Sequence, residues 1–457
     1  MTIYRKGRAT FLVSLAITAS LTLFTASCSP DDILDVEDPD IINPSNVQSP
    51  AGADAVRLGA LSRFNGATSG DESLFLLGGL FSDEWINGDS FIARQEIDQR
   101  VITIENNFLT NANRQLHRTR LAAQQAVALL REYSPTAPGW QVGEMLMIQA
   151  YTLNLMGEHM CDGLIISDVV EGREEYGEPI TTAAAFERAL GLANEGLTTV
   201  TGSTSNDLRV RHALALTKGR IFTNLNRHSE AATAVAGIPT SYQYVHYHYQ
   251  TTWSNAFWSW NKNSRRYSVS DHEGTNGLDF ASAKDPRVTV CAGNDAACKA
   301  IGVTRTVRDD LTGPFMVLMT WPNREDPIAI MQGVDARMIE AEAQLKAGQA
   351  ATALATLNAA RTTVAGLAPL TDAGTADARL KQLFRERAFW QYSRGYRTGD
   401  LRRLIRQYGQ TQAAVFPTGT WHKGGNYGTD VDMPVPQAEQ NNPNLGITLQ
   451  TCMSRGA

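Results

Sequence analysis

The chain has 457 residues and a formal net charge of −6, from 41 basic and 47 acidic residues. This acidic balance disfavours a nucleic-acid partner, which would select a basic patch. Hydrophobic residues make up 43% of the chain, enough for a large core, and the length exceeds the usual size of a single core, so two lobes are expected.

The first 27 residues have the pattern of a secretory signal. Arg5, Lys6 and Arg8 precede an apolar run over residues 11–24, which at 14 residues is shorter than the roughly 20 needed to cross a bilayer core. Residues 1–27 are therefore expected to be cleaved and to take no part in the fold. Without these three cations the mature chain carries 38 basic and 47 acidic residues, a net charge of −9.

Cys28 ends the sequence TASC, which resembles a bacterial lipobox. Lipidation at Cys28 would supply several acyl chains, enough for stable membrane anchoring. The alternative is an ordinary cleavage site with an incidental cysteine. Residues 28–50 are polar, acidic and rich in proline, so they are expected to form a tether, and SPDD at its start resembles a surface-export signal. The acids of the tether do not match a calcium-loop pattern.

From residue 51 to residue 457 the dominant pattern is helical. In segment 333–348 apolar residues recur at spacings of four, three and four, which indicates one helical stripe. Gly348 follows at a position that favours a left-handed cap. Segment 349–367 repeats the pattern, so the two predict a helical hairpin. The stripe residues are Val334, Met338, Ala341 and Leu345, then Ala350, Ala353, Leu354 and Leu357.

Two more helical pairs are predicted. In residues 210–239, Ser229 is expected to cap the second helix and Pro239 to close the unit. The other pair begins at 143–158 and resumes at 182–197 after an insertion. Pairs of this kind resemble tetratricopeptide repeats, which are about 34 residues long. We therefore expect a mainly α fold with a tetratricopeptide-like scaffold and a loop-rich lobe. In the 210–239 unit, the first helix is expected to carry Leu214, Ile221 and Leu225.

Residues 240–330 form the main loop-rich insertion of the body. Nine of the chain's 36 aromatic residues fall within residues 241–267. Aromatic faces can stack on sugar rings, they can form a protein interface, or they can pack the floor of the lobe. His246 and His248 share a face if this segment is a strand, but no third ligand is near and no metal site is predicted. The nine are Tyr242, Tyr244, Tyr247, Tyr249, Trp253, Phe257, Trp258, Trp260 and Tyr267.

Four cysteines remain besides Cys28. Cys291 and Cys298 close a short loop, for which a local disulfide is expected in an oxidising compartment. Cys161 and Cys452 are then left either to pair across the fold or to stay free, and the sequence leaves both alternatives open.

No catalytic motif is present, since the chain lacks H-E-x-x-H, G-x-S-x-G, a phosphate loop and C-x-x-C. Acids such as Asp83 with Glu84, or Glu174 with Glu175, could face across a cleft, as a secreted glycoside hydrolase would require. A chain with 47 acids supplies such pairs by chance. A binding protein without a cofactor is therefore the favoured interpretation, and a hydrolase is the alternative.

Seven arginines lie in segment 385–406. Glu386 and Asp400 are placed to pair with some of them, and Leu401 and Leu404 indicate a packed helix. We therefore interpret the segment as structural and not as a basic binding stripe.

The same segment resembles the C-terminal signature of the SusD/RagB family of nutrient-binding outer-membrane lipoproteins. The family has an E-R pair followed by E-G-x-R and D-L-x-R, and Arg394 stands here where the family usually has Glu. With the lipobox, the resemblance covers essentially the whole mature chain. The matching stretches are Glu386-Arg387, Gly395-Tyr396-Arg397, Asp400-Leu401-Arg402-Arg403, the D-P-R turn at 285–287 and the close at 433–445.

This resemblance implies a lipid-anchored protein on the outer face of the outer membrane. It would form a lid over a SusC-type TonB-dependent transporter, trap oligosaccharides, or alternatively peptides, and pass them inward. By position, an early loop and the central insertion are expected to supply the ligand contacts. The expected ligand-binding residues are Trp85, Asn87, Trp253, Trp258, Trp260 and Trp321.

Overall fold

The computed structural model of the protein describes residues 47–170, 173–445 and 452–457. The signal segment, Cys28 and most of the tether lie outside the described residues. The chain divides into the units Met1–Gln48 and Ser49–Ala457, and all the elements below belong to the second unit. Within the described ranges, no helix has both the length and the apolar character needed to span a membrane.

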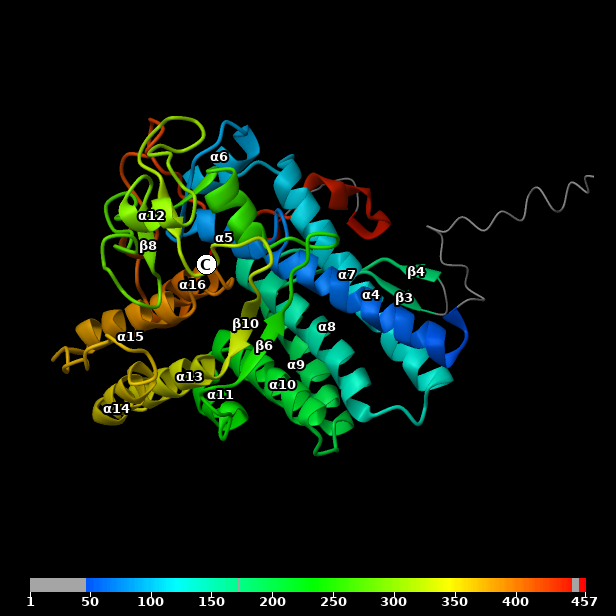
Figure 1. Cartoon of the computed structure of the whole chain (residues 1–457). Helices are drawn as coiled ribbons and strands as arrows, with labels where there is room; N and C mark the ends of the chain where they lie inside the picture. Colours follow the sequence, from blue (N-terminus) through cyan, green and yellow to red (C-terminus); the bar gives the residue numbers. More distant parts are fainter. Residues whose placement is uncertain (1–46, 171–172, 446–451) are drawn as a thin grey trace, which may run out of the picture. The chain divides into compact units, whose positions relative to one another are not determined.

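The second unit begins with two long helices that pack side by side, α4 and α7 (Figure 1). Each has a side-chain cap: Ser49 Oγ accepts from Gly52 N at 3.0 Å, and Asn106 Oδ1 accepts from Leu109 N at 3.0 Å. Short elements connect them. In chain order these are α4 (Pro50–Ser69), α5 (Leu74–Phe81), β1 (Trp85–Asn87), α6 (Ile92–Gln99) and α7 (Asn107–Tyr133).

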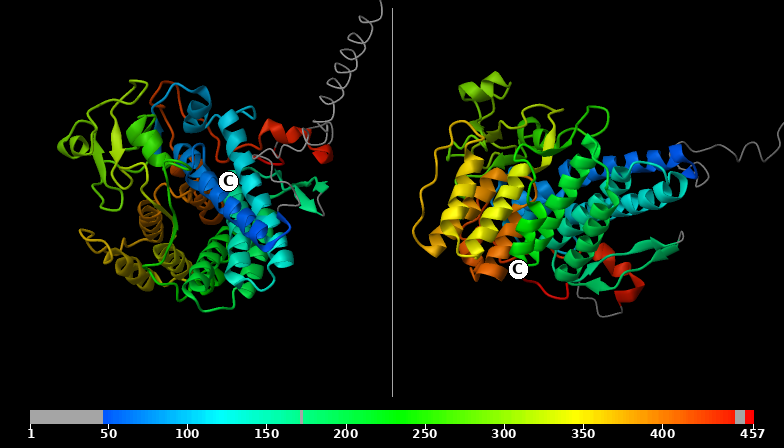
Figure 2. Two further views of the ribbon diagram at one scale, coloured as in Figure 1. Left: turned by 45° about the vertical axis from the view of Figure 1, so that its right-hand side comes forward. Right: turned by 90° about the horizontal axis from the view of Figure 1, so that it is seen from below.

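The predicted helical pairs are confirmed. Neighbouring helices of the series pack against one another, α8 on α9, α9 on α10, α10 on α11, and α13 on α14 (Figures 1 and 2). Gly348, between α13 and α14, has φ +75°, the left-handed conformation expected of it. The bounds are α8 (Gly139–His159), α9 (Thr182–Thr199), α10 (Ser205–Asn224), α11 (His228–Val235), α13 (Gly333–Lys346) and α14 (Ala350–Arg361).

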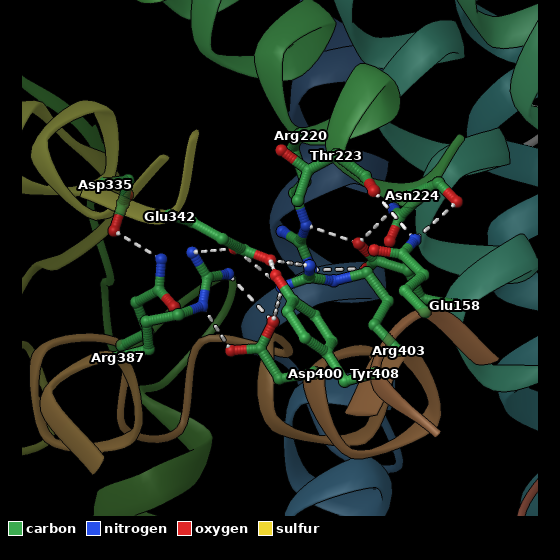
Figure 3. Close-up of polar contacts among 12 residues, drawn as sticks. Glu158, Arg220, Thr223, Asn224, Asp335, Glu342, Arg387, Asp400, Arg403 and Tyr408 are labelled. Carbon is green, nitrogen blue, oxygen red and sulfur yellow. Dashed lines mark hydrogen bonds and ion pairs between the residues drawn. The ribbon is translucent and has the colours of Figure 1, made fainter. Parts of the chain in front are cut away.

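Helix α8 is the centre of the helical scaffold. Every one of its residues from Gly143 to His159 is buried, as expected for a helix that is covered on all sides. Among its polar residues, Glu158 accepts from two side chains of α10, from Arg220 Nε at 2.8 Å and from Asn224 Nδ2 at 2.7 Å (Figure 3). The scaffold is therefore built around a helix with a polar as well as an apolar interior.

One predicted cap is wrong. Helix α11 begins at His228 with Arg227 at the N-cap position, and Ser229 lies inside its first turn. The side chain of Arg227 does not cap the backbone of the first turn and donates instead to the carboxylate of Glu230. The chain enters α11 through a tight turn in which Asn226 has φ +59°. The turn from α10 sets where this helix begins.

The strands are short, and every sheet within the described residues has two strands. One insertion, between α8 and α9, contains β2 to β5, paired as β2 with β5 and β3 with β4. The lobe over residues 240–330 contains β6 to β10, in which β6 pairs with β10, β7 with the early strand β1, and β8 with β9. The pairing β1–β7 places Trp85 opposite Val269. The bounds are β2 (Leu164–Ile165), β3 (Asp168–Val170), β4 (Arg173–Glu175), β5 (Pro179–Ile180), β6 (Gln243–His246), η1 (Trp258–Asn263), β7 (Tyr267–Val269), β8 (Val290–Ala292), α12 (Ala296–Ala300), β9 (Met316–Leu318) and β10 (Ile328–Gln332).

The arginine-rich segment forms α15 and α16 and is mostly buried, which confirms the structural interpretation. Arg387 donates to both oxygens of Asp400 at 2.7 and 2.8 Å, and Arg403 donates to Asp400 at 2.7 Å and to Glu342 (Figure 3). Arg394 pairs with Asp335 at 2.7 and 2.9 Å. The C-terminal elements are α15 (Ala376–Trp390), α16 (Arg397–Tyr408), α17 (Gln412–Val415), η2 (Gln437–Asn441) and η3 (Pro443–Leu445).

Both disulfides considered from the sequence are present. Cys291 and Cys298 join the ends of a short loop, and Cys161 joins Cys452 across 291 residues of sequence. The second bond settles the alternative that the sequence left open, and it fastens the C-terminal end of the chain to the segment that follows α8.

Candidate ligand-binding site

Three exposed aromatic rings line one cavity of about 460 Å³. Tyr247, Tyr249 and Trp253 are 63%, 56% and 37% exposed, respectively. The size lies within the range of about 300–1,000 Å³ that is common for small-molecule sites. The cavity lies where α4, α8 and α10 meet β6 and the loop that follows it. We call this cavity, with its three rings, the aromatic cavity.

Helix α4 holds the rings of the aromatic cavity in place. Trp253 Nε1 donates to Ser62 Oγ at 2.9 Å, and Asn65 Nδ2 donates to the carbonyl of Tyr247 at 2.9 Å. The indole of Trp253 lies against Gly66, where an added Cβ would be 3.0 Å from the ring. The backbone of the loop is closed by Tyr249 N, which donates to Trp253 O at 2.9 Å. The Trp253 ring is therefore held on α4, and the loop that carries Tyr247 and Tyr249 is attached to the same helix through its backbone.

Charged and polar groups form the rest of the cavity wall. Glu144 is 2% exposed and accepts from Arg209 at 2.7 Å and from the Tyr244 hydroxyl at 3.0 Å. Arg57 lies 3.6 Å from its second oxygen. Both guanidinium groups also lie over the ring of Trp140, at 5.4 Å for Arg57 and 5.9 Å for Arg209. Burial, followed by the nearby Glu144 carboxylate, raises the pKa of Tyr244 well above its ordinary value, so it remains a donor.

The three predicted tryptophans of the central insertion do not share one cavity. Trp253 lines the aromatic cavity, whereas Trp258 lines a second cavity of about 370 Å³ with Lys262, Asn263 and Arg265. Trp260 lines neither, and its Nε1 donates to Asp71 Oδ1 at 2.7 Å.

Trp260 belongs to a different surface. Its ring lies 4.0 Å from the buried guanidinium of Arg94 and 5.4 Å from that of Arg266. Arg266 also lies 5.3 Å from the ring of Phe91, which is 50% exposed. Burial raises the pKa of Asp71, although its hydrogen bond from Trp260 opposes the shift. We call Trp260, Phe91 and Arg266 the Trp260 surface.

The structure contradicts the prediction that Trp85 and Asn87 of the early loop contact a ligand. Trp85 and Asn87 are both 0% exposed, so neither has a surface for a ligand. Trp85 stacks on Phe257 at 6.2 Å and Phe257 stacks on Trp321 at 4.8 Å, which makes a layer of rings inside the lobe. Trp321 is half-buried at the outer end of this layer. Asn87 instead holds the loop, because its Oδ1 accepts from Asp89 N at 2.9 Å.

Tyr247, Tyr249 and Trp140 are cavity residues that the site prediction from the sequence did not include. The available signal was the alternation in YVHYHY. Tyr244, His246 and His248 are buried, whereas Tyr247 and Tyr249 are exposed. The alternation predicts two faces of an extended segment. Which of the two faces is exposed to solvent depends on contacts with α4, which is far away in the sequence.

Two of the acids considered for hydrolysis, Asp83 and Glu84, are buried in the fold. Asp83 is 1% exposed and is held by Arg397 at 2.6 and 2.8 Å. Glu84 is equally buried, and burial, partly opposed by a hydrogen bond from Ser393 N, raises its pKa to about 8. Glu174 and Glu175 belong to the short strand β4.

Comparison with known proteins identifies the fold. No protein-family model and no curated protein sequence matches the chain. Solved structures do match. A SusD superfamily protein from Parabacteroides distasonis aligns with a TM-score of 0.62 at 12% identity, covering 86% of this chain and 98% of that one. A laminarin-binding SusD-like protein aligns with a TM-score of 0.58 at 15% identity, covering 87% and 98%.

A third neighbour, a SusD-like carbohydrate-binding protein from Bacteroides vulgatus, aligns with a TM-score of 0.55 at 10% identity, covering 77% of this chain and 83% of that one. At these identities the matches establish the fold. The chain therefore has the SusD-like fold, a mainly helical architecture on a tetratricopeptide-like scaffold, as the order of its short motifs predicts.

Proposed function

We propose that this protein binds oligosaccharides without turning them over, and that the aromatic cavity is the binding site. One observation carries the proposal: three exposed rings, one of them held on α4, line a cavity whose wall holds Glu144, Arg57 and Arg209. Flat aromatic faces can stack on the apolar faces of sugar rings, while carboxylate and guanidinium groups hydrogen-bond to hydroxyls. SusD-like structural neighbours that bind carbohydrate or laminarin support this class of ligand.

We further propose that the protein works at the cell surface. In this scheme it is lipid-anchored through Cys28 and passes its ligand to a SusC-type TonB-dependent transporter in the outer membrane. The TASC sequence before an acidic tether and the SusD-like fold support the scheme. Mass spectrometry of the mature N-terminus tests the anchor, and an unmodified Cys28 would contradict it. Co-purification with a large barrel protein tests the partnership, which fails if the purified protein brings down no such partner.

The binding proposal is tested by calorimetric titration with laminarin, starch and xylan oligosaccharides, and with a mixture of peptides. We expect one oligosaccharide class to bind and no product to be released. Trp253→Ala should weaken binding at least about tenfold, because a stacking face is lost. A double Tyr247→Ala, Tyr249→Ala variant should act in the same direction.

Phe91→Ala is the matched control, because Phe91 is an exposed ring outside the aromatic cavity. The Phe91→Ala variant should bind the oligosaccharide with the same affinity as the unmodified protein. Loss of binding in Phe91→Ala and Trp260→Ala, with Trp253→Ala unaffected, would move the site to the Trp260 surface. Binding of peptides alone would overturn the ligand class, and released sugar would overturn the absence of turnover.

A further inference from the structure

A second cluster of functional groups lies outside both aromatic surfaces. Asp98 on α6, Glu273 in the loop after β7 and His422 in the loop after α17 each offer one ligand atom, and these atoms all lie within 4.8 Å of one another. Asp98 is 1% exposed and Glu273 is 3% exposed. The three residues are far apart in sequence, which explains why no metal-binding motif is visible there.

The histidine is already oriented as a metal ligand. Its Nε2 lies 2.9 Å from the carbonyl of Asn87, which accepts the ring proton and leaves the Nδ1 lone pair free. Nδ1 then lies 3.5 Å from Asp98 Oδ2. Two ligands bound to one zinc ion at tetrahedral angles are about 3.4 Å apart, since each bond is about 2.1 Å long. The observed separation matches that geometry.

Each ligand is also held by an outer partner. Asp98 Oδ2 accepts from Trp421 Nε1 at 2.7 Å, and Glu273 Oε1 accepts from the Tyr427 hydroxyl at 2.6 Å. Such outer hydrogen bonds orient the ligands of metal sites. The cluster therefore has both the inner ligands and the outer hydrogen-bond partners that are typical of a metal site.

Two buried atoms that face this cluster lack any hydrogen-bond partner: Glu273 Oε2 and His422 Nδ1. The cations nearby are engaged elsewhere. Lys423 pairs with Asp310 at 2.5 Å, and Arg308 donates to Thr312 Oγ1 at 3.2 Å. Within the described part of the chain, neither forms an ion pair with the two carboxylates. A free lone pair beside two buried carboxylates is unfavourable unless a proton or a metal cation lies between them.

We propose that Asp98, Glu273 and His422 bind a divalent transition-metal ion, Zn²⁺ in preference to Mn²⁺. One imidazole nitrogen and two carboxylate oxygens favour such an ion over Ca²⁺, which prefers a shell of six to eight oxygens. A charge of +2 balances the two carboxylates. The ion would join α6 to two loops that follow it by more than 150 residues, so its role is structural.

The test uses the full mature chain after chelator treatment, titrated by calorimetry with Zn²⁺, Mn²⁺ and Ca²⁺. We expect one Zn²⁺ per chain, weaker binding of Mn²⁺, still weaker binding of Ca²⁺, and a melting temperature that rises with Zn²⁺. Glu273→Gln and His422→Ala should each weaken Zn²⁺ binding more than about a hundredfold, since loss of an outer partner alone costs roughly 10–100-fold. His212→Ala, a half-buried histidine on α10, is the matched control and should bind as the unmodified protein does.

Two measurements keep the test decisive if a ligand variant fails to fold. Trp421→Phe removes only an outer donor and should weaken Zn²⁺ binding roughly 10–100-fold. X-ray absorption at the zinc edge of the unmodified protein should show a nitrogen and oxygen shell with one imidazole. A protein that binds no stoichiometric Zn²⁺, or binds Ca²⁺ at least as tightly, overturns the proposal. Unchanged affinity in Glu273→Gln and His422→Ala, or a sulfur shell, does so too.

Discussion

At the scale of single residues, Glu84 shows how burial can change the chemistry of a carboxyl group. Its Oε1 accepts from Ser393 N at 2.8 Å, but its Oε2 has no partner. Burial is the main cause that raises its pKa to about 8, from an ordinary value of 4.5. The folded protein therefore binds this proton more tightly than the unfolded chain does, and the free energy of unfolding falls as the pH rises from 4.5 to 8.

Glu84→Gln should remove this pH dependence, because an amide keeps the hydrogen bond from Ser393 and carries no charge. The melting temperature of the variant, relative to the unmodified protein, should increase steadily from pH 5 to pH 8 and level off above it. Exposed Glu105→Gln serves as a control with no such trend. A difference for Glu84→Gln that does not change with pH would contradict the prediction.

The aromatic residues show what the sequence could predict at this scale and what it could not. The chemistry of residues 241–267 was visible, since rings and polar side chains alternate there. The exposure of each ring was not visible. Trp85 and Tyr247 are equally suitable for stacking, yet Trp85 is 0% exposed beneath Phe257 and Tyr247 is 63% exposed beside α4. The difference comes from contacts with residues more than 150 positions away.

At the scale of elements, α4 acts as the support for the proposed binding site. Two of its glycines make a matched pair: Gly66 contacts the Trp253 ring, whereas Gly59 has nothing within 4 Å of an added Cβ. Both lie inside the helix, where alanine is intrinsically favoured over glycine by about 1 kcal/mol.

Gly59→Ala should therefore raise the melting temperature and leave oligosaccharide binding unchanged. Gly66→Ala should weaken binding, because its methyl group displaces the Trp253 indole, and it should gain less stability than Gly59→Ala. Calorimetric titration and thermal unfolding of the two variants measure both effects. Equal affinity in the two variants would show that oligosaccharide binding does not depend on the position of the Trp253 indole against Gly66.

The ion-pair layer between α13, α15 and α16 is the second element-scale feature. Glu342 is fully buried, and it accepts from Arg403 at 3.1 Å and from the Tyr408 hydroxyl at 2.6 Å (Figure 3). Burial by itself would raise the pKa of Glu342, but Arg403 and Arg387 outweigh it and lower the pKa to about 2. The carboxylate is thus charged at every pH at which the protein is expected to work.

Glu342→Gln should lower the free energy of unfolding by about 3–5 kcal/mol, because two buried guanidinium groups lose their shared counter-charge. Urea unfolding at pH 7 measures this loss. Asp372→Asn breaks the exposed pair with Arg379 and should stay close to the unmodified protein, since exposed pairs contribute little. A comparable loss in both variants would indicate that burial does not determine the effect.

Helical pairs were predictable at this scale because their signal is local. Val334, Met338 and Ala341 recur at helical spacing, and all three are buried in α13. The start of α11 was not predictable, because the turn after α10 places Arg227 at the N-cap position and Ser229 inside the first turn. The cluster of Asp98, Glu273 and His422 could not be found either, because only the folded chain brings the three together.

At the scale of the whole molecule, the disulfides differ in the length of chain that they close. Cys161 and Cys452 are separated by 291 residues, and Cys291 and Cys298 by 7. A cross-link stabilises mainly by restricting the unfolded chain, and its effect grows with the logarithm of the loop length.

Replacing Cys161 and Cys452 together by alanine should cost about 3 kcal/mol more stability than replacing Cys291 and Cys298 together. Urea unfolding of both double variants, compared with the unmodified protein, measures the difference. Equal losses would mean that local contacts around each bond, and not the length of the closed loop, determine the effect.

The position of α4 has a mechanical consequence. It is the first helix of the Ser49–Ala457 unit, it begins at Pro50, and Trp253 rests on its second half. Its 20 residues extend for about 30 Å. A force applied at the start of α4 would therefore reach Trp253 along a single helix. A load on the start of α4 and the affinity for a ligand in the aromatic cavity would then be coupled. Single-molecule stretching from the N-terminal end could measure this coupling.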